Sequence, residues 1–158
     1  MYERDYLMRI VLMYAEILRR SWFRAREDND PKGAADMLEE AIGNATEIDG
    51  VTLLSLSPES MAAVLQVSGT DPRVMEYVAR SLLLASVYLR EANEQALADL
   101  RLDQARALAD AYELDIPDDP EELAMLADEA AGEKYAEEHA IIDIESVSGG
   151  PPALEGSR

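Results

Sequence analysis

The segment 28–39 has acidic residues spaced as in a calcium-binding loop. Counted from its first residue, acids fall at positions one, three, nine and twelve, and Gly33 stands at position six. Carboxylate oxygens in such a pattern are ligands that Ca²⁺ prefers. However, Lys32 places a cation at a ligand position, and Pro31 fixes the backbone within the loop. A helix that begins at Pro31 behind a capping Asp30 explains the same residues without a metal, so a calcium-responsive protein is the less favoured alternative.

The residues needed for covalent or acid–base catalysis are scarce. The sequence has no cysteine, its one histidine is His139, and it contains no glycine-rich phosphate loop. His139 has no second ligand at the helical spacing that metal sites use. Adjacent carboxylates such as Glu39 and Glu40 point in different directions on a helix. These observations favour a non-enzymatic protein, and we predict no catalytic residue, cofactor or metal.

The most distinctive cluster is aromatic and basic. Trp22 and Phe23 stand among Arg19, Arg20, Arg24 and Arg26. Tryptophan and arginine are enriched at the centres of protein interfaces. We therefore predict that a protein partner, or a second copy in a homodimer, is bound by four residues: Arg19, Trp22, Phe23 and Arg26. The alternative is that Trp22 covers the core while the arginines pair with acidic residues of the same chain.

A small-ligand sensor or enzyme is a second alternative. Tyr14, Tyr77 and Tyr88 would line its pocket together with nearby acids, and a sizeable polar cavity between helices would favour it.

Charge argues against a nucleic-acid partner. The net charge is −19, but residues 1–26 hold six arginines against three acids, which gives +3 there and −22 in the remainder. An acidic body repels phosphate, so the helix-turn-helix-like pattern between Ser57 and Val78 is not expected to read DNA. The longest apolar run near the N-terminus, 10–15, is too short for a membrane span or a secretory signal, so we expect a cytoplasmic protein without membrane contact.

Four capping residues followed by proline predict helix starts. They are Asp30-Pro31, Ser57-Pro58, Asp71-Pro72 and Asp119-Pro120. Gly69 and Asn93 are expected to end helices. The resulting prediction is six helices near 2–27, 31–47, 58–68, 72–92, 94–114 and 120–139. Residues 51–56 are expected to form a buried connector, and 143–158 a flexible tail after a single domain, 1–142.

Apolar patterning predicts which helices are buried. The first and fourth helices are apolar around much of their circumference, as in 10–15 and 82–85, so both are expected to be central. The second and fifth helices have one apolar face each, with Asp99, Arg101 and Asp103 directed outward in the fifth.

Two resemblances accompany this prediction. An offset of 71 aligns Leu12 with Leu83 and Ala34 with Ala105, and the spacing of Ala34, Leu38 and Ala41 resembles the second helix of tetratricopeptide repeats. That likeness implies an array of antiparallel helical hairpins that binds proteins. The opening 1–10, MYERDYLMRI, resembles an uncharacterised family of small bacterial all-helical proteins. This second likeness implies a bacterial, cytoplasmic, helical protein and no activity. The overall prediction is an all-α, tetratricopeptide-like array of helical hairpins that acts as a protein-interaction or scaffold module.

Overall fold

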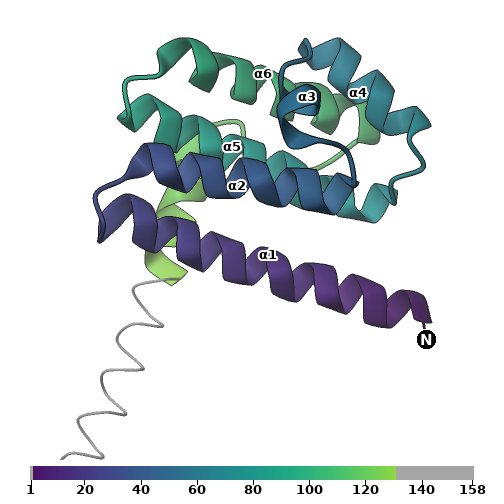
Figure 1. Cartoon of the computed structure of the whole chain (residues 1–158), viewed down its shortest axis with the longest axis horizontal. Helices are drawn as coiled ribbons and strands as arrows, with labels where there is room; N and C mark the ends of the chain where they lie inside the picture. The colour runs from purple at the N-terminus through teal and green to yellow at the C-terminus, as the bar shows by residue number, and fades with distance from the viewer. Residues whose placement is uncertain (1, 131–158) are drawn as a thin grey trace, which may run out of the picture. The chain divides into compact units, whose positions relative to one another are not determined.

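The computed structural model describes residues 2–130, and the chain divides into two units, 1–127 and 128–158. Six α-helices carry labels in Figure 1: α1 (Tyr2–Arg26), α2 (Pro31–Thr46), α3 (Gly50–Leu54), α4 (Pro58–Val67), α5 (Met75–Glu91) and α6 (Gln95–Tyr112). A 3₁₀ turn, η1 (Pro72–Val74), leads into α5, and residues 120–130 are also helical. No strand occurs among the described residues, so the all-α prediction is confirmed. The predicted domain boundary at 142 and the tail lie outside the described residues.

The proline-topped caps start helices as predicted. Asp30 accepts a hydrogen bond from the Gly33 amide, and Ser57 accepts one from the Ser60 amide. The two other capping side chains, Asp71 and Asp119, accept from amides two residues further along. These bonds satisfy N–H groups that the first turn of a helix leaves without a partner. The predicted helix starts are therefore confirmed by their cap geometry.

The predicted helix ends are also confirmed. Gly69 has φ +82°, and Asn93, which separates α5 from α6, has φ 63°. Both values lie in the left-handed region, where glycine and asparagine are the residues most readily accommodated. Glu47 and Glu113 end α2 and α6 in the same conformation, with φ 58° and 53°. Nothing in the residue type of a glutamate indicates this role in advance.

The expectation of a connector at 51–56 is wrong for its first part. Residues 50–54 form the short helix α3, because Asp49 accepts hydrogen bonds from both the amide and the hydroxyl of Thr52. Leu53 and Leu54 are buried, so the segment does contribute to the core.

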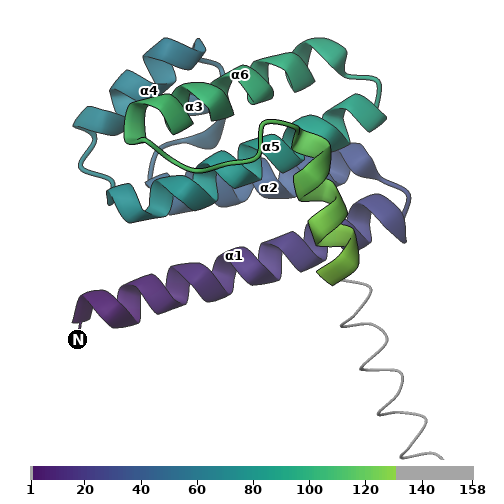
Figure 2. The same cartoon turned by 180° about the vertical axis from the view of Figure 1, so that it is seen from behind.

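Four helices lie side by side in the order α1, α2, α5 and α6, and each runs antiparallel to the next (Figure 1). From behind, α4 is seen against α6 on the side away from α1 (Figure 2). Helix α5 occupies the middle of this array, and its residues 81–89 are all buried. The prediction that this segment is central is therefore confirmed. The tetratricopeptide-like character remains a prediction.

Helix α1 is not central, so the prediction that the first helix is central is wrong. It forms the edge of the array, and Ser21 and Ala25 near its C-terminal end are buried against the body. Its N-terminal half diverges from α2, as both cartoons show. Leu12 is 62% exposed there and Met8 54%. An edge helix has one face against the body, so apolar residues around its circumference cannot all be covered.

Arg101 is buried, although the sequence pattern predicted an outward position. Its guanidinium donates to the Glu39 carboxylate, to the Leu54 carbonyl and to Gln104. The Gln104 amide in turn donates to the carbonyls of Leu54 and Leu56. This network attaches the C-terminal end of α3 and the residues after it to α6 and α2. Glu39 and Leu54 come from two segments that are distant in the sequence, which explains why local periodicity placed Arg101 incorrectly.

Candidate interaction surface on helix α1

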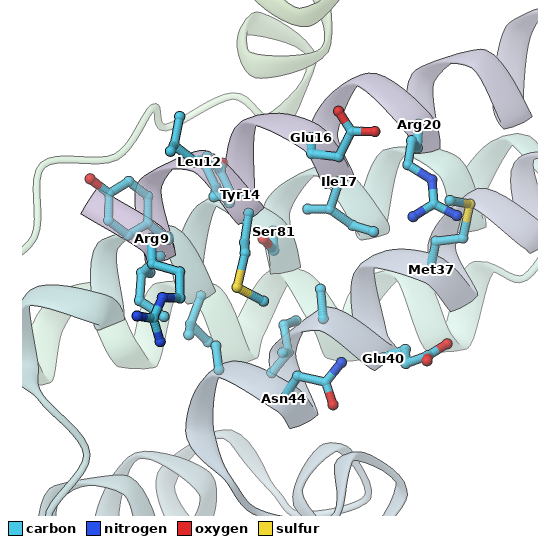
Figure 3. A pocket seen from close by; sticks show the side chains of 17 residues that line it. Arg9, Leu12, Tyr14, Glu16, Ile17, Arg20, Met37, Glu40, Asn44 and Ser81 are labelled. Carbon is cyan, nitrogen blue, oxygen red and sulfur yellow. The ribbon is translucent and has the colours of Figure 1, made fainter. Parts of the chain in front are cut away.

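A groove of about 530 Å³ lies between residues 9–20 of α1, the C-terminal half of α2 and the start of α5 (Figure 3). It exists because α1 diverges from α2 while α5 closes the space behind them. Apolar side chains supply most of its lining: Ile10, Leu12, Met13 and Ile17 from α1, Met37, Ala41, Ile42 and Ala45 from α2, and Val78 from α5. Such a surface binds by burial of apolar area, with a few polar groups that fix orientation.

Two tyrosines lie at the α5 side of the groove. The rings of Tyr14 and Tyr77 are 4.9 Å apart between centroids and are tilted by 47°. The Tyr14 hydroxyl is buried and makes no hydrogen bond in the described structure; Ser81 lies near it without hydrogen-bonding geometry. Burial raises the pKa of Tyr14 well above its ordinary value, and the positive charge of Arg80 opposes part of that rise. Tyr14 is therefore neutral at physiological pH.

The tyrosines that the sequence grouped into one pocket are only partly brought together. Tyr14 and Tyr77 line the groove, but Tyr88 does not. The Tyr88 ring instead lies beneath the Arg26 guanidinium, 5.4 Å from its carbon to the ring centroid. This distance is typical of a cation–π contact.

Charged residues stand at the rim of the groove. Arg9 and Arg20 lie toward its two ends, and Glu40 and Asn44 line the α2 side (Figure 3). Within the described residues, neither Arg9 nor Arg20 makes an ion pair or hydrogen bond, although the chain as a whole is strongly acidic. Because Glu16 and Glu40 also line the groove, charges of both signs stand beside its apolar floor, which favours an occupant with apolar side chains and complementary charges of both signs.

The predicted interaction residues lie toward the C-terminal end of α1. Arg19 pairs with Glu16 at 2.8 Å, and the half-buried rings of Trp22 and Phe23 meet edge to face, 5.1 Å apart. Arg26 pairs with Glu91 of α5 at 2.6 Å between Nη1 and Oε1. Arg26 therefore does pair with the acidic body, as the alternative interpretation proposed. Partner binding by these four residues remains a prediction.

Sequence reasoning missed the exposed apolar half of α1. Five large apolar side chains are exposed there: Tyr6, Met8, Val11, Leu12 and Met13. The run 10–15 by itself is typical of a central helix, which is why the pattern predicted one. The signal that could have corrected this prediction is the four charged residues Asp5, Arg9, Glu16 and Arg20, which share one side of the same helix. A fully enclosed helix rarely has such a charged side.

The calcium-like segment has the conformation of a helix start. Residues 31–39 belong to α2, and the Asp30 carboxylate caps that helix and pairs with Arg24 at 2.7 Å. The amide of Gly33 and the Arg24 guanidinium hold the pKa of Asp30 below its usual value. Among residues 2–130, no three or more acidic or histidine side chains are grouped as a metal site requires. His139 lies outside the described residues.

No family model matches the chain, and neither the curated proteins nor the solved structures contain a match. In the described part of the chain, no helix has the length and apolar character needed to cross a membrane. The class of protein that the fold and the surface define is an all-α array of antiparallel helices with an open groove at one edge.

Proposed function

We propose that the protein is a non-enzymatic helical interaction module, and that its docking surface is the N-terminal half of α1 with the adjoining groove. The observation that carries the proposal is the concentration of exposed apolar side chains on one edge helix. Leu12 is 62% exposed and Met13 is 52% exposed, and both line the groove. Contiguous apolar surface of this kind on a folded domain is typical of protein-binding sites.

The chemistry of the groove supports a helical partner. Along α1, the lining extends from Arg9 to Arg20, which corresponds to about 16 Å, or three turns of helix. An amphipathic helix binds such a groove through apolar side chains spaced three and four residues apart. The unpaired guanidinium groups at either end would bind carboxylates on the polar side of that helix. Methionine side chains in the lining add adaptable contacts, as in other helix-binding surfaces.

The test compares two pairs of substitutions that remove similar apolar surface. The chain with Leu12→Ser and Met13→Ser loses the middle of the proposed surface. A control with Val51→Ser and Val67→Ser alters residues that are 82% and 85% exposed on α3 and α4. The unaltered chain, the α1 variant and the control are each immobilised and incubated with extract of the native cell, and the retained proteins are identified by mass spectrometry. We expect the same proteins on the unaltered chain and the control, and their loss from the α1 variant.

Equal retention by both variants would contradict the proposed surface. Far-UV circular dichroism must show unchanged helicity in each, because a variant that unfolds would lose its partners for another reason.

A small-ligand sensor is the second candidate function, supported by the Tyr14 hydroxyl. This buried group without a hydrogen-bond partner lies at a groove of about 530 Å³, which is within the range of small-molecule sites. A ligand with a polar atom that reaches Tyr14 would satisfy it. Such a ligand would raise the melting temperature of the unaltered chain more than that of a Tyr14→Phe variant. Equal shifts in a screen of small metabolites would remove this support.

A further inference from the structure

One side of α1 has an ordered sequence of charged and apolar residues. At 100° per residue, six residues fall within an arc of about 100° around the helix axis. They are Asp5, Arg9, Leu12, Met13, Glu16 and Arg20, and all six are exposed. We call this set the α1 stripe. All of its members except Asp5 also line the groove.

The order of charges along the α1 stripe is self-complementary. From the N-terminus it reads negative, positive, two apolar residues, negative and positive. A second α1 laid antiparallel places Asp5 opposite Arg20 of the second copy and Arg9 opposite its Glu16. Leu12 then lies beside Leu12 of the second copy and Met13 beside its Met13, one contact on each side of the line along which the helices meet. In each charged pair the two residue numbers add to 25, so one register satisfies them all, and two-fold symmetry repeats every contact.

The opposite orientation does not have this property. A parallel α1 in register places each charged residue beside its own equivalent, which puts like charges together. Like charges across an interface are unfavourable, so the sequence of charges selects the antiparallel arrangement.

The surroundings of the α1 stripe leave its charges available. Within the described residues, Asp5, Arg9 and Arg20 make no ion pair or hydrogen bond. Glu16 has only its neighbour Arg19 on the same helix, an exposed contact that contributes little to stability.

We propose that the occupant of this surface is a second copy of the chain. The two copies form a symmetric dimer through antiparallel α1 helices, with the two-fold axis between Leu12 and Met13. This rests on the proposed function, because it names the partner for the same docking surface. Apolar contact between the centres of the stripes provides the association, and the four flanking ion pairs fix its direction and register.

Charge reversal tests the pairing of Arg9 with Glu16 of the second copy. Sedimentation velocity over a concentration series would give the dimer dissociation constant of the 158-residue chain and of its variants. Arg9→Glu and Glu16→Arg each replace two attractive pairs by two repulsive ones. We expect each to raise the dissociation constant at least about tenfold, which corresponds to about 1.4 kcal/mol. The double variant restores opposite charges and should return the constant close to its original value.

Arg4→Glu is the matched control. Arg4 is exposed on the same helix, and the substitution changes the charge by the same amount, but its direction is about 100° away from that of Asp5. The control should dimerise like the unaltered chain, with unchanged helicity. If the control weakens the dimer as much as Arg9→Glu does, general charge and not the pairing is responsible, and the proposal fails.

Disulfide formation distinguishes the two orientations. The chain has no cysteine. If one tagged copy has Asp5→Cys and another has Arg20→Cys, every disulfide that forms must therefore join two introduced cysteines. Under oxidation, antiparallel packing predicts mixed disulfides that join one variant to the other. Preferential formation of disulfides between two copies of the Asp5→Cys variant would indicate parallel packing and overturn the proposal.

A monomeric unaltered chain at high micromolar concentration would also overturn the proposed dimer. If that monomer still retained other proteins through Leu12 and Met13, the proposed function would stand with a different partner. Failure of the dimer and failure of the interaction module are therefore distinguishable.

Discussion

Arg101 Nε lies 3.0 Å from Glu39 Oε2, and this ion pair joins α6 to α2 across 62 residues of sequence. Its environment makes the pair sensitive to disruption: the Arg101 side chain is 7% exposed and the Glu39 side chain 20%. The Gln104 side-chain oxygen and the Leu54 carbonyl accept the other hydrogen bonds that the guanidinium donates. A buried cation with all these partners specifies where α3 and α6 meet.

Replacing Arg101 with alanine should destabilise the fold strongly. The substitution leaves the Glu39 carboxylate without its main partner, and the Leu54 carbonyl loses a donor. Removing one member of a buried pair costs about 3–5 kcal/mol, and we expect the lower end because Glu39 is partly exposed. Urea unfolding followed by circular dichroism would measure the change. Arg106→Ala, an exposed arginine on the same helix, is the control, and an equal loss there would contradict the special role of Arg101.

Tyr14→Phe should leave the fold as stable or stabilise it by up to about 1 kcal/mol, because a buried hydroxyl without a partner costs free energy. The pH dependence follows from the raised pKa of Tyr14. The folded state retains the Tyr14 proton more tightly than the unfolded chain does. The protonated Tyr14 hydroxyl therefore contributes its full stabilisation below pH 10, near the pKa of tyrosine in the unfolded chain. This stabilisation is lost as the pH rises through the pKa of Tyr14 in the folded state.

The measurement for Tyr14 is the free energy of unfolding between about pH 9 and 11, where an unfolded tyrosine begins to ionise. Stability of the unaltered chain should fall with rising pH more steeply than that of Tyr14→Phe. Tyr6→Phe, at an exposed position, should behave like the unaltered chain. Identical slopes in the unaltered chain and Tyr14→Phe would contradict the buried position of the hydroxyl.

Substitutions at Trp22 and Arg26 can distinguish a role in binding a partner from a role in holding α1 in place. Trp22→Ala should reduce retention of partner proteins without loss of helicity, if the aromatic and basic cluster extends the docking surface. Arg26→Ala removes a surface cation, the ion pair with Glu91 and the contact with the Tyr88 ring. Glu91→Gln removes the ion pair and leaves the α1 surface intact. Weaker retention with Arg26→Ala but not with Glu91→Gln would show that loss of the ion pair is not the cause, whereas equal effects would assign Arg26 to support of α1.

The sequence predicts the helices because their ends are determined locally. Asp30 and Ser57 stand directly before proline, and each caps a helix within three residues. Asn93 ends a helix through its own tolerance of positive φ. α3 was not predicted, since five residues are too few to show helical periodicity and Asp49 before Gly50 is equally typical of a turn.

The packing of α1 and Arg101 could not be predicted in this way. The run 10–15 is compatible with a helix enclosed by neighbours and with one that keeps a face open, and only the tertiary arrangement decides between them. Arg101 stands between acidic residues, as surface arginines commonly do. Its real partner, Glu39, becomes a neighbour only once α2 and α6 are in place. The surface that we propose from the structure lies on the same helix as the predicted interaction residues but nearer its N-terminal end.

Helix α1 is attached more firmly at its C-terminal end than at its N-terminal end. At that end Ala25 is buried and Arg26 pairs with Glu91, and Tyr14 contacts Tyr77 midway, while the exposed Arg9 lies about 25 Å from Arg26 along the axis. A rotation of a few degrees about the held end displaces the helix far more at Arg9 than at Arg20. A substitution at the C-terminal end of α1 can therefore widen or narrow the mouth of the groove without altering any residue that lines it.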